Sequence, residues 1–281
     1  MAVSERQLRR DLCEVGRRLY QSGLAVGSDG NLSALLDGEE ILITPSRVCK
    51  GFMDPDDIIK IDRKGNKLSG ILPPSLETAM HLAAYEERAD ICAAVHAHPP
   101  VSVAFTVAGV AMPQCVLPEV EVLFGGEIPV AEYATPGGPA LADSIRPYIR
   151  EKDVVILAHH GMLAVGQDIY QAFMRMEHAE ATAKVILYAR QLGGVKKLSE
   201  ASLEGLRALR QKLAATERAV FCGSCRACEP GGARAIVEGA GTPMTVPALS
   251  MAASSRSGPL PDDRLEDLVR EITQQILSGR G

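Results

Sequence analysis

Two short apolar runs that end in histidine stand out in the pattern of hydrophobic and polar positions. One covers residues 91–98 and is stopped by Pro99-Pro100, and the other covers residues 154–161. An unbroken apolar run of this length, closed by helix-breaking residues, indicates a strand that is buried on both faces. Because side chains two positions apart on a strand share a face, His96 and His98 are expected on one side of the sheet.

Four of the six histidines lie where these two strands end, and they predict a metal site. Imidazole is the commonest metal-ligating side chain, and zinc accepts nitrogen ligands in fours, or in threes with an open position. A lone His-x-His pair would favour hydrogen-bonded core histidines. His159 and His160, at the end of a matching strand, favour a three-histidine metal site instead.

A carboxylate is expected beside this site. Ser75 is a suitable N-cap, and residues 76–85 contain good helix formers without glycine or proline. Glu77 would then lie in the first helical turn, where the helix dipole favours its ionised form. Beside a divalent cation it would ligate the metal, act as a base, or do each in turn. Its position alone also fits an ordinary dipole-matching glutamate.

The same pattern predicts the other elements of a mixed α/β domain. Helical spacing indicates helices from Ser4 to Gly23, at 101–112, from Asp168 to Gly193, and at 199–218. Strands are expected before the hairpin turn Asp37-Gly38, at 41–43, at 58–61 and just before Tyr133.

Composition narrows the classes of protein. The chain has 281 residues and 46% hydrophobic content, which suits one domain of roughly 200 residues plus an extension. A net charge of −5 without a basic block argues against nucleic acid as a partner. No apolar run is long enough to span a membrane, and the polar N-terminus lacks a secretion signal. Seven cysteines without an export signal indicate reduced thiols in the cytoplasm.

Three motifs carry a resemblance to a known family. They are Pro74-Ser75-Leu76-Glu77 with His81 four residues later, His96-Ala97-His98, and His159-His160-Gly161. Together they resemble the class II aldolase/adducin family, over the chain from its first helix to Leu192. The resemblance implies a three-layer α/β/α fold, in which a central, mostly antiparallel sheet is flanked by helices and followed by a flexible C-terminal tail. It also implies a homotetramer with active sites between subunits.

Carried over residue by residue, the resemblance assigns the metal site. His96, His98 and His160 become the ligands of one zinc ion per subunit, with another divalent metal as the alternative. Glu77 becomes the catalytic acid/base, which also ligates zinc when no substrate is bound. His159 is then only a neighbour of the site, and His81 and His178 receive no role.

The family also holds a substrate phosphate with three loops, consistent with anion binding by backbone amides and helix starts. The matching positions here are Gly30, Asn31, Ser46, Arg47 and Ser75. Two positions depart from the aldolase pattern, because Arg47 stands where glycine is usual and Leu76 replaces a second serine. The arginine would add a bidentate phosphate contact, and the leucine removes a hydroxyl.

The activity implied is a zinc-dependent aldolase that reversibly cleaves a ketose 1-phosphate, of the fuculose 1-phosphate type, to dihydroxyacetone phosphate and an aldehyde such as lactaldehyde. The alternatives are a sugar-phosphate 4-epimerase, a decarboxylase or a dehydratase of the same family, or a non-catalytic, adducin-like binding module. Fuculose-phosphate aldolases carry a tyrosine near the position of Leu117 and another in the C-terminal region. Neither is evident here, which argues against strict fuculose specificity.

The C-terminal part is not typical of the family. We assign residues 1–216 to the aldolase domain, 217–260 to a linker rich in glycine, alanine, proline and serine, and 261–279 to an amphipathic helix. Within the linker, Cys222, Cys225 and Cys228 form a C-x-x-C-x-x-C run. This run would bind a metal with a fourth ligand from elsewhere, or hold reduced or redox-active thiols.

The apolar stripe of the 261–279 helix predicts a docking partner, because a tethered helix cannot easily bury such a stripe within its own chain. The arrangement is similar to the encapsulation peptides that load enzymes into bacterial microcompartments, so shell or cargo proteins are the expected partners. In the alternative, the helix folds back on its own oligomer. Its acidic or neutral polar face argues against binding to a membrane surface.

Overall fold

All strands described in the computed structural model belong to one eight-stranded sheet, and this model describes residues 4–36 and 40–221. The strand order is β4-β3-β2-β1-β5-β8-β7-β6. Neighbouring strands pair antiparallel, except β6 and β7, which run parallel. The strands are β1 Asn31–Leu35, β2 Glu40–Ile43, β3 Ile59–Asp62, β4 Lys67–Ser69, β5 Ala93–Ala97, β6 Val130–Ala131, β7 Val154–Leu157 and β8 Gly161–Gly166.

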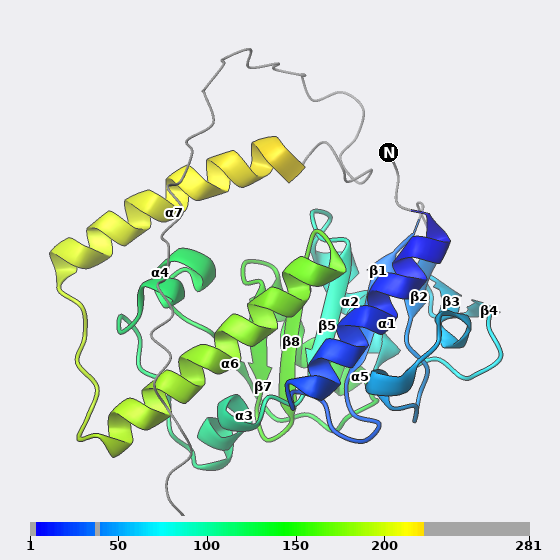
Figure 1. Cartoon of the computed structure of the whole chain (residues 1–281), viewed down its shortest axis with the longest axis horizontal. Helices are drawn as coiled ribbons and strands as arrows, with labels where there is room; N and C mark the ends of the chain where they lie inside the picture. The colour runs from blue at the N-terminus through cyan, green and yellow to red at the C-terminus, as the bar shows by residue number, and fades with distance from the viewer. Residues whose placement is uncertain (1–3, 37–39, 222–281) are drawn as a thin grey trace, which may run out of the picture. The chain divides into compact units, whose positions relative to one another are not determined.

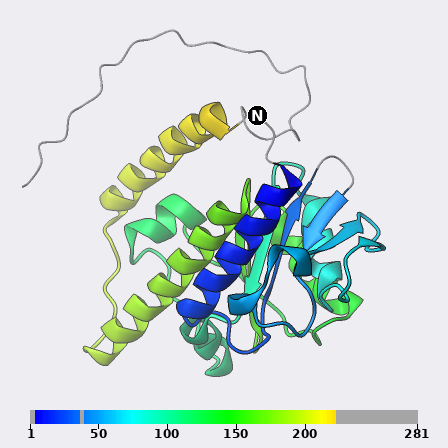
Figure 2. The ribbon, with the colours of Figure 1, turned by 45° about the vertical axis from the view of Figure 1, so that its right-hand side comes forward.

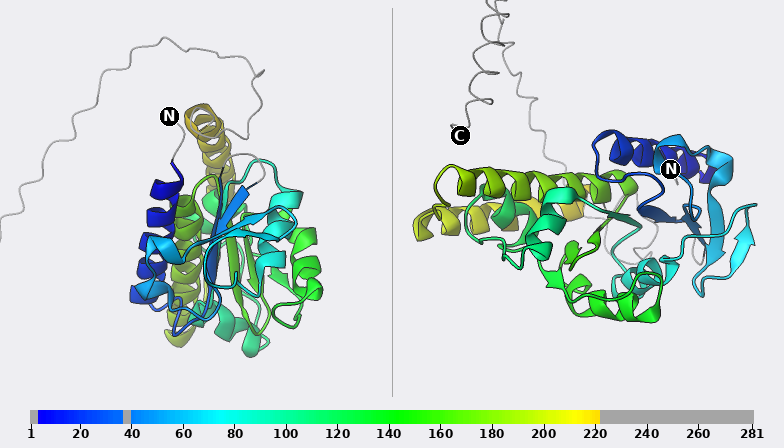
Figure 3. Two further views of the ribbon diagram at one scale, coloured as in Figure 1. Left: turned by 90° about the vertical axis from the view of Figure 1, so that its right-hand side faces the viewer. Right: turned by 90° about the horizontal axis from the view of Figure 1, so that it is seen from below.

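Helices cover both faces of this sheet (Figures 1 and 3). The α-helices are α1 Glu5–Gln21, α2 Thr78–Glu87, α3 Pro100–Val107, α4 Pro118–Phe124, α5 Pro139–Ile149, α6 Ile169–Gln191 and α7 Glu200–Phe221, and the short 3-10 helices are η1 Lys50–Phe52 and η2 Pro55–Asp57. Helices α1 and α6 lie side by side on one face (Figure 2), and α2 packs beside α5 on the other. The predicted three-layer fold with a mostly antiparallel sheet is thereby confirmed.

Alternation along the strands sorts the side chains between the two layers. On β5, Ala93 and Val95 join the core under α1 and α6, whereas Ala94 joins the core under α2 and α5. His96 follows the even-numbered positions, so its side chain lies on the face that α2 covers. The buried histidine is therefore brought to the side of the sheet from which Glu77 approaches, at the start of α2.

Several local predictions are corrected. The second apolar run is not one strand, because β7 stops at Leu157 and a turn through His160 leads into β8, which was not predicted. Helix α2 begins at Thr78 with Glu77 as its N-cap, not Ser75, because the hydroxyl and carbonyl of Ser75 accept hydrogen bonds from the backbone amides of Glu77 and Thr78 in a preceding turn.

Other boundaries also shift. Helix α3 ends at Val107, before Gly109 with its positive φ of 65°. Helices α4 and α5 were not predicted, and α5 carries Pro147 in its interior. Helix α7 continues through residue 217, where the linker was expected to begin, as far as Phe221. The Asp37-Gly38 turn, the rest of the predicted linker and the C-terminal helix lie outside the described residues.

Helix α3 connects the two histidine-bearing segments. It begins at Pro100, two residues after His98, and its first turn is held by Glu180 of α6, a buried carboxylate. This carboxylate accepts hydrogen bonds from the amides of Val101 and Ser102, at 3.0 and 2.9 Å, and from the Ser102 hydroxyl at 2.8 Å. Near the other end of α3, the Thr106 hydroxyl accepts a hydrogen bond from the amide of His159 at 2.9 Å. No helix among residues 4–36 and 40–221 is long and apolar enough to cross a membrane.

We expect Glu180→Ala to lower the free energy of unfolding by about 2–4 kcal/mol, because three donors lose a charged, buried acceptor. Urea denaturation monitored by circular dichroism measures the loss. Glu177→Ala, an exposed glutamate on the same helix, is the control and should change the free energy little. If both variants unfold alike, the Glu180 carboxylate is not what anchors α3.

Candidate active site

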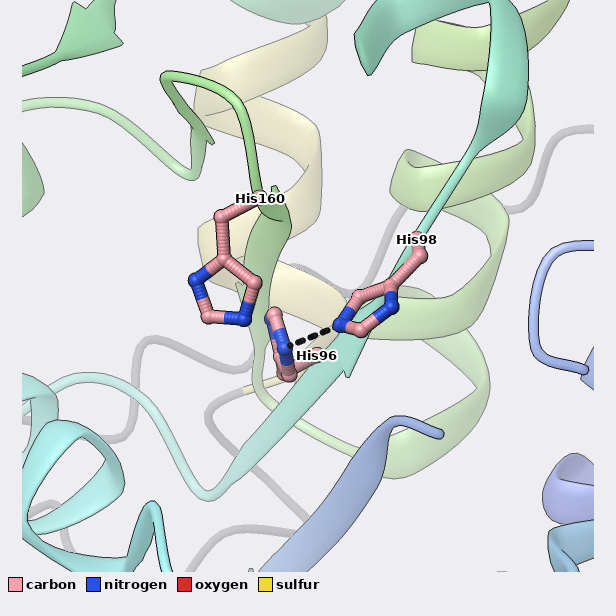
Figure 4. Close-up of side chains that lie close together, drawn as sticks. All are labelled: His96, His98 and His160. Atoms are coloured by element: carbon pink, nitrogen blue, oxygen red, sulfur yellow. Dashed lines mark hydrogen bonds between the residues drawn. The ribbon is translucent and has the colours of Figure 1, made fainter. Parts of the chain in front are cut away.

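Three histidines converge where β5 and β8 run side by side. His96 lies on β5, His98 follows its last residue, and His160 lies in the turn before β8. Their ring centroids are 4.9 to 5.1 Å apart, and one nitrogen from each ring lies within 4.8 Å of the others. Figure 4 shows the three rings turned towards one point. His159, with a positive φ of 57°, is exposed and outside this cluster.

Close backbone approach makes this convergence possible. Gly161 follows His160, and a Cβ atom there would lie 2.5 Å from the carbonyl oxygen of Ala97 and 2.7 Å from Cδ2 of His98. No side chain fits at such distances without displacing backbone. Glycine at 161 is therefore a condition for His98 and His160 to meet.

Hydrogen bonds fix which nitrogens face the centre of the cluster. Nδ1 of His96 lies 3.0 Å from the Met162 carbonyl oxygen, which can only accept, so this nitrogen carries the hydrogen and Nε2 carries the lone pair. Nδ1 of His98 lies 3.3 Å from a carboxylate oxygen of Asp29, which orients that ring in the same way. Burial, together with His96 and His160, lowers the pKa of His98 to about 4, so its ring is neutral at neutral pH.

This donor set fits a divalent cation. The two Nε2 atoms of His96 and His98 lie 3.2 Å apart, and two lone pairs at that distance repel each other unless a positive charge lies between them. In His160, Nε2 faces Glu77 at 3.2 Å, whereas Nδ1 is buried on the other side of the ring without a hydrogen-bond partner.

Glu77 completes the cluster from the side of α2. Its carboxylate oxygens lie 3.1 Å from Nε2 of His96 and 3.2 Å from Nε2 of His160. A third contact is a hydrogen bond of 2.8 Å from the side-chain amide of Asn31. Burial alone would raise the pKa of Glu77, but His96, His160 and Asn31 outweigh it and hold the pKa well below its ordinary value. The carboxylate is thus ionised beside three imidazoles that could hold a metal ion.

A cavity of about 310 Å³ opens beside Glu77. All five residues expected to bind phosphate line it, and so do Glu77, His98 and His160. The complete lining is Ser28, Asp29, Gly30, Asn31, Pro45, Ser46, Arg47, Lys50, Ser75, Leu76, Glu77, His98, Pro136, Gly137 and His160. The structure therefore joins the histidine cluster and the three expected anion-binding loops in one space.

Two of the expected phosphate residues have unusual backbones. Gly30 has a φ of +73°, and a Cβ there would meet the His96 carbonyl oxygen at 2.7 Å. Arg47 has a φ of +60° and is exposed. For a residue with a side chain, this left-handed conformation costs about 1–2 kcal/mol. The arginine is thus held in a conformation that suits the glycine usual at this position.

Lys50 is a site residue that the sequence did not reveal. Its side chain is buried, and its ammonium donates hydrogen bonds to the carbonyl oxygens of Ser28 and Val48, at 3.0 and 2.5 Å. Each carbonyl belongs to a different anion-binding loop, so one buried cation ties the two loops together. Burial lowers the pKa of Lys50 to about 8. In the sequence, a single lysine after a loop is indistinguishable from a solvated one.

His81 also received no role from the sequence. Its side chain is buried near the site, and its Nε2 lies 2.5 Å from Oδ1 of Asn31. Its spacing of four residues from Glu77 was the available signal, since residues four apart share one side of a helix. By contrast, His178 is exposed and does not line the cavity. Cys222, Cys225 and Cys228 lie outside the described part of the chain.

With fold and site in view, comparison with known proteins identifies the family. The model of the Class II Aldolase and Adducin N-terminal domain matches residues 10–187. The chain therefore belongs to the class II aldolase and adducin family, as the three motifs indicated.

Relatives with assigned activities include decarboxylases and aldolases of sugar phosphates. A 3-oxo-tetronate 4-phosphate decarboxylase of Cupriavidus necator is 36% identical over 194 residues, covering 68% of this chain and 88% of the relative. An L-fuculose phosphate aldolase of Methanocaldococcus jannaschii is 32% identical over 179 residues, covering 64% of this chain and 95% of the relative.

Solved structures of the family have a similar fold. YgbL of Escherichia coli, described as an aldolase, epimerase or decarboxylase, has a TM-score of 0.67 and 30% identity, with 72% of this chain and 99% of YgbL covered. A structure of L-fuculose 1-phosphate aldolase has a TM-score of 0.66 and 30% identity, with 75% of this chain and 98% of the aldolase covered.

We expect each chain to bind one divalent cation and His160→Ala to weaken that binding by more than about a hundredfold, because an inner ligand is lost. Competition with a coloured chelator measures the affinity, and elemental analysis measures the bound metal. His178→Ala is the matched control, since this histidine is exposed on α6. Equal affinity in the two variants would contradict a metal site at the cluster.

Lys50→Met should change how stability depends on pH. Because the pKa of Lys50 falls from 10.5 to about 8 on folding, its unfavourable contribution is complete below pH 8 and disappears as the pH rises to 10.5. The free energy of unfolding of the wild type, relative to Lys50→Met, should therefore rise across this range by at most about 3 kcal/mol. Urea titrations at several pH values check this, and parallel curves would show that Lys50 does not titrate there.

Proposed function

We propose that this protein is a metal-dependent carbon–carbon lyase that decarboxylates a 3-oxo acid phosphate of the 3-oxo-tetronate 4-phosphate type. The observation that carries the proposal is the shared cavity, which is lined by His98, His160 and Glu77 of the histidine cluster and also by the anion-binding loops with Arg47 and Lys50. This arrangement suits a small substrate with an oxygen-rich reacting centre and a phosphate a few bonds away.

Zinc is the proposed ion. Three imidazole nitrogens, together with a carboxylate ligand that substrate can displace, are typical of a catalytic zinc site. When bound, such an ion acts as a Lewis acid on carbonyl and hydroxyl oxygens. The protein's own residues do the rest. The loops around Lys50 would hold the phosphate, and Glu77, ionised and at the cavity wall, would exchange a proton with the reacting carbon.

In the proposed reaction, the bond between C1 and C2 of the 3-oxo acid breaks and carbon dioxide leaves. The electron pair of that bond moves towards the 3-oxo group and leaves an enediolate. Glu77, which is a carboxylate in the resting site, takes up one proton from the cavity side and delivers it to C2, which gives dihydroxyacetone phosphate. The reaction consumes this one proton in total.

Decarboxylation is preferred to aldol cleavage for a chemical reason. Cleavage of a ketose 1-phosphate leaves the same enediolate, but it also requires a group that removes the proton of the hydroxyl that becomes the aldehyde. Tyrosine supplies such a group in fuculose-phosphate aldolases, and no tyrosine is among the residues that line the described cavity. Carbon dioxide leaves without this proton transfer, and the identity to decarboxylases of the family supports the same choice.

Aldol cleavage of a ketose 1-phosphate is the second candidate, since fuculose phosphate aldolases are also among the relatives. The homotetramer and a microcompartment partner for residues 261–279 stay predictions from the sequence. The same holds for a metal or redox role of Cys222, Cys225 and Cys228.

We expect the zinc-loaded protein to release carbon dioxide and dihydroxyacetone phosphate from 3-oxo-tetronate 4-phosphate faster than the spontaneous reaction does. Glu77→Gln should reduce kcat by about a hundredfold or more, because it removes the group that transfers the proton. A coupled dehydrogenase assay for dihydroxyacetone phosphate measures both rates.

L-fuculose 1-phosphate and ribulose 5-phosphate are assayed in parallel. Aldehyde release from fuculose 1-phosphate without carbon dioxide release from the oxo acid would establish the aldolase instead. Epimerisation of ribulose 5-phosphate would point to the epimerase alternative. A zinc-loaded protein that turns over none of the three substrates would refute the lyase proposal.

A further inference from the structure

A buried row of polar side chains links α2 and β1 to the candidate acid/base. We call it the polar zipper, and it consists of Tyr85, Ser33, His81, Asn31 and Glu77, in this order. The successive contacts measure 2.7 Å from Tyr85 to Ser33, 2.6 Å from Ser33 to His81, 2.5 Å from His81 to Asn31 and 2.8 Å from Asn31 to Glu77. All five side chains are buried.

The rise of α2 over four residues is close to the rise of β1 over two residues, which explains why side chains from the two elements alternate in the row. Residues 77, 81 and 85 are four apart on α2, which advances about 6 Å every four residues. Residues 31 and 33 are two apart on β1, which advances about 6.6 Å every two residues. Ser33 and Asn31 also lie opposite Ala94 and His96, on the face of the sheet that α2 covers. One helix stripe and one strand face therefore supply alternate members of the row.

The direction of every hydrogen bond in the polar zipper follows from Glu77, the last residue of the row. The NH₂ group of Asn31 donates to a carboxylate oxygen of Glu77, so Oδ1 of Asn31 faces His81. Oδ1 can only accept, so Nε2 of His81 carries the hydrogen. Because burial lowers the pKa of His81 to about 3, the ring is neutral and its Nδ1 accepts from the Ser33 hydroxyl. Ser33 in turn accepts from the hydroxyl of Tyr85.

The row orients Asn31 and does not conduct protons to Glu77. A carboxamide cannot relay a proton without becoming an imidic acid, so the Asn31 step interrupts any proton path from Tyr85. A flipped amide would instead place its oxygen 2.8 Å from the Glu77 carboxylate and face its NH₂ towards the hydrogen of His81. Both contacts would be repulsive, so His81 selects one of the two amide orientations.

We propose that His81, supported by Ser33 and Tyr85, is a positioning residue that holds the Asn31 amide with its NH₂ group towards Glu77. The hydrogen bond from Asn31 fixes one carboxylate oxygen while the other faces His160. Asn31 thus orients the Glu77 carboxylate, and the exchange of protons at Glu77 occurs on the side of the carboxylate that faces the cavity. For its effect on turnover, this inference rests on the lyase function proposed above, whereas the orientation of Asn31 does not.

The composition of the chain allows a direct spectroscopic test. There are only two asparagines, Asn31 and Asn66. Asn66 is exposed in the turn after β3, so it serves as an internal reference. Protein labelled with ¹⁵N-asparagine should give two side-chain NH₂ signals, and Asn31→Ser identifies the one from Asn31. After transfer to D₂O, the Asn31 signal should exchange at least about a hundredfold more slowly than that of Asn66, since it is buried and hydrogen-bonded.

Two replacements of His81 separate hydrogen bonding from space filling. His81→Gln keeps a donor for Asn31 and an acceptor for Ser33, whereas His81→Phe keeps the ring and loses both. We expect slow Asn31 exchange in His81→Gln and exchange accelerated by about tenfold or more in His81→Phe. Ser33→Ala is a smaller change and should accelerate Asn31 exchange to an intermediate extent. It replaces His81→Phe in the experiment if that variant does not fold. Unchanged Asn31 exchange in the folded Phe and Ala variants would overturn the proposal.

Kinetics provide the second readout. His81→Phe should lower kcat by about ten- to a hundredfold with little change in KM and in bound zinc, and His81→Gln should restore most of kcat. His178→Phe, on the exposed face of α6, is the control for a histidine-to-phenylalanine change. If His81→Gln loses as much kcat as His81→Phe, the imidazole acts through its shape and not by orienting Asn31. A wild-type protein without lyase activity would refute the proposed function alone, because Asn31 exchange would still decide the role of His81.

Discussion

The register between β5 and β8 is the constraint on which the site depends. Ala97 lies opposite Met162, which brings the residues after one strand beside those before the other. The same pairing lets His96 donate to the Met162 carbonyl and so sets the tautomer of that ring. A slip of one residue would turn His96 to the opposite face of the sheet and separate the three imidazoles. Sheet pairing, more than any side-chain contact, creates a geometry that could hold a metal ion.

The cavity is lined by some residues that favour a cation and by others that favour an anion. Three imidazoles and an ionised glutamate beside the cavity favour a divalent cation. The same cavity is lined by Lys50, which is buried between two loops, and by the exposed Arg47, and these two residues favour an anion. The buried ammonium of Lys50 donates hydrogen bonds to two backbone carbonyls, and burial lowers its pKa only to about 8, so the positive charge is retained near neutral pH. The reacting part and the anionic part of a substrate would thus be held by different parts of the fold.

Much of the histidine cluster and of the fold could be predicted from the sequence, because these features depend on short-range periodicity. The alternation on β5 placed His96 and His98 on one face, and the motifs around Glu77 and His160 indicated the family. Long-range partners were not readable. Asn31 meets His81 across 50 positions, and Lys50 is buried by segments distant in sequence. Helix α5 escaped prediction because Pro147 interrupts its helical pattern. The exact start of α2 depended on a turn at Ser75, which competes with capping by the same side chain.

The glycine after His160 has a consequence for recognising such sites in other chains. Even a methyl group at position 161 would collide with the backbone of the first histidine strand and with an imidazole of the cluster. Spacing between histidines can vary wherever loops absorb the difference, but this point of contact tolerates no substituent. A histidine followed at once by glycine, at the entrance to a short apolar strand, should therefore be a more discriminating marker than a His-x-His pair alone.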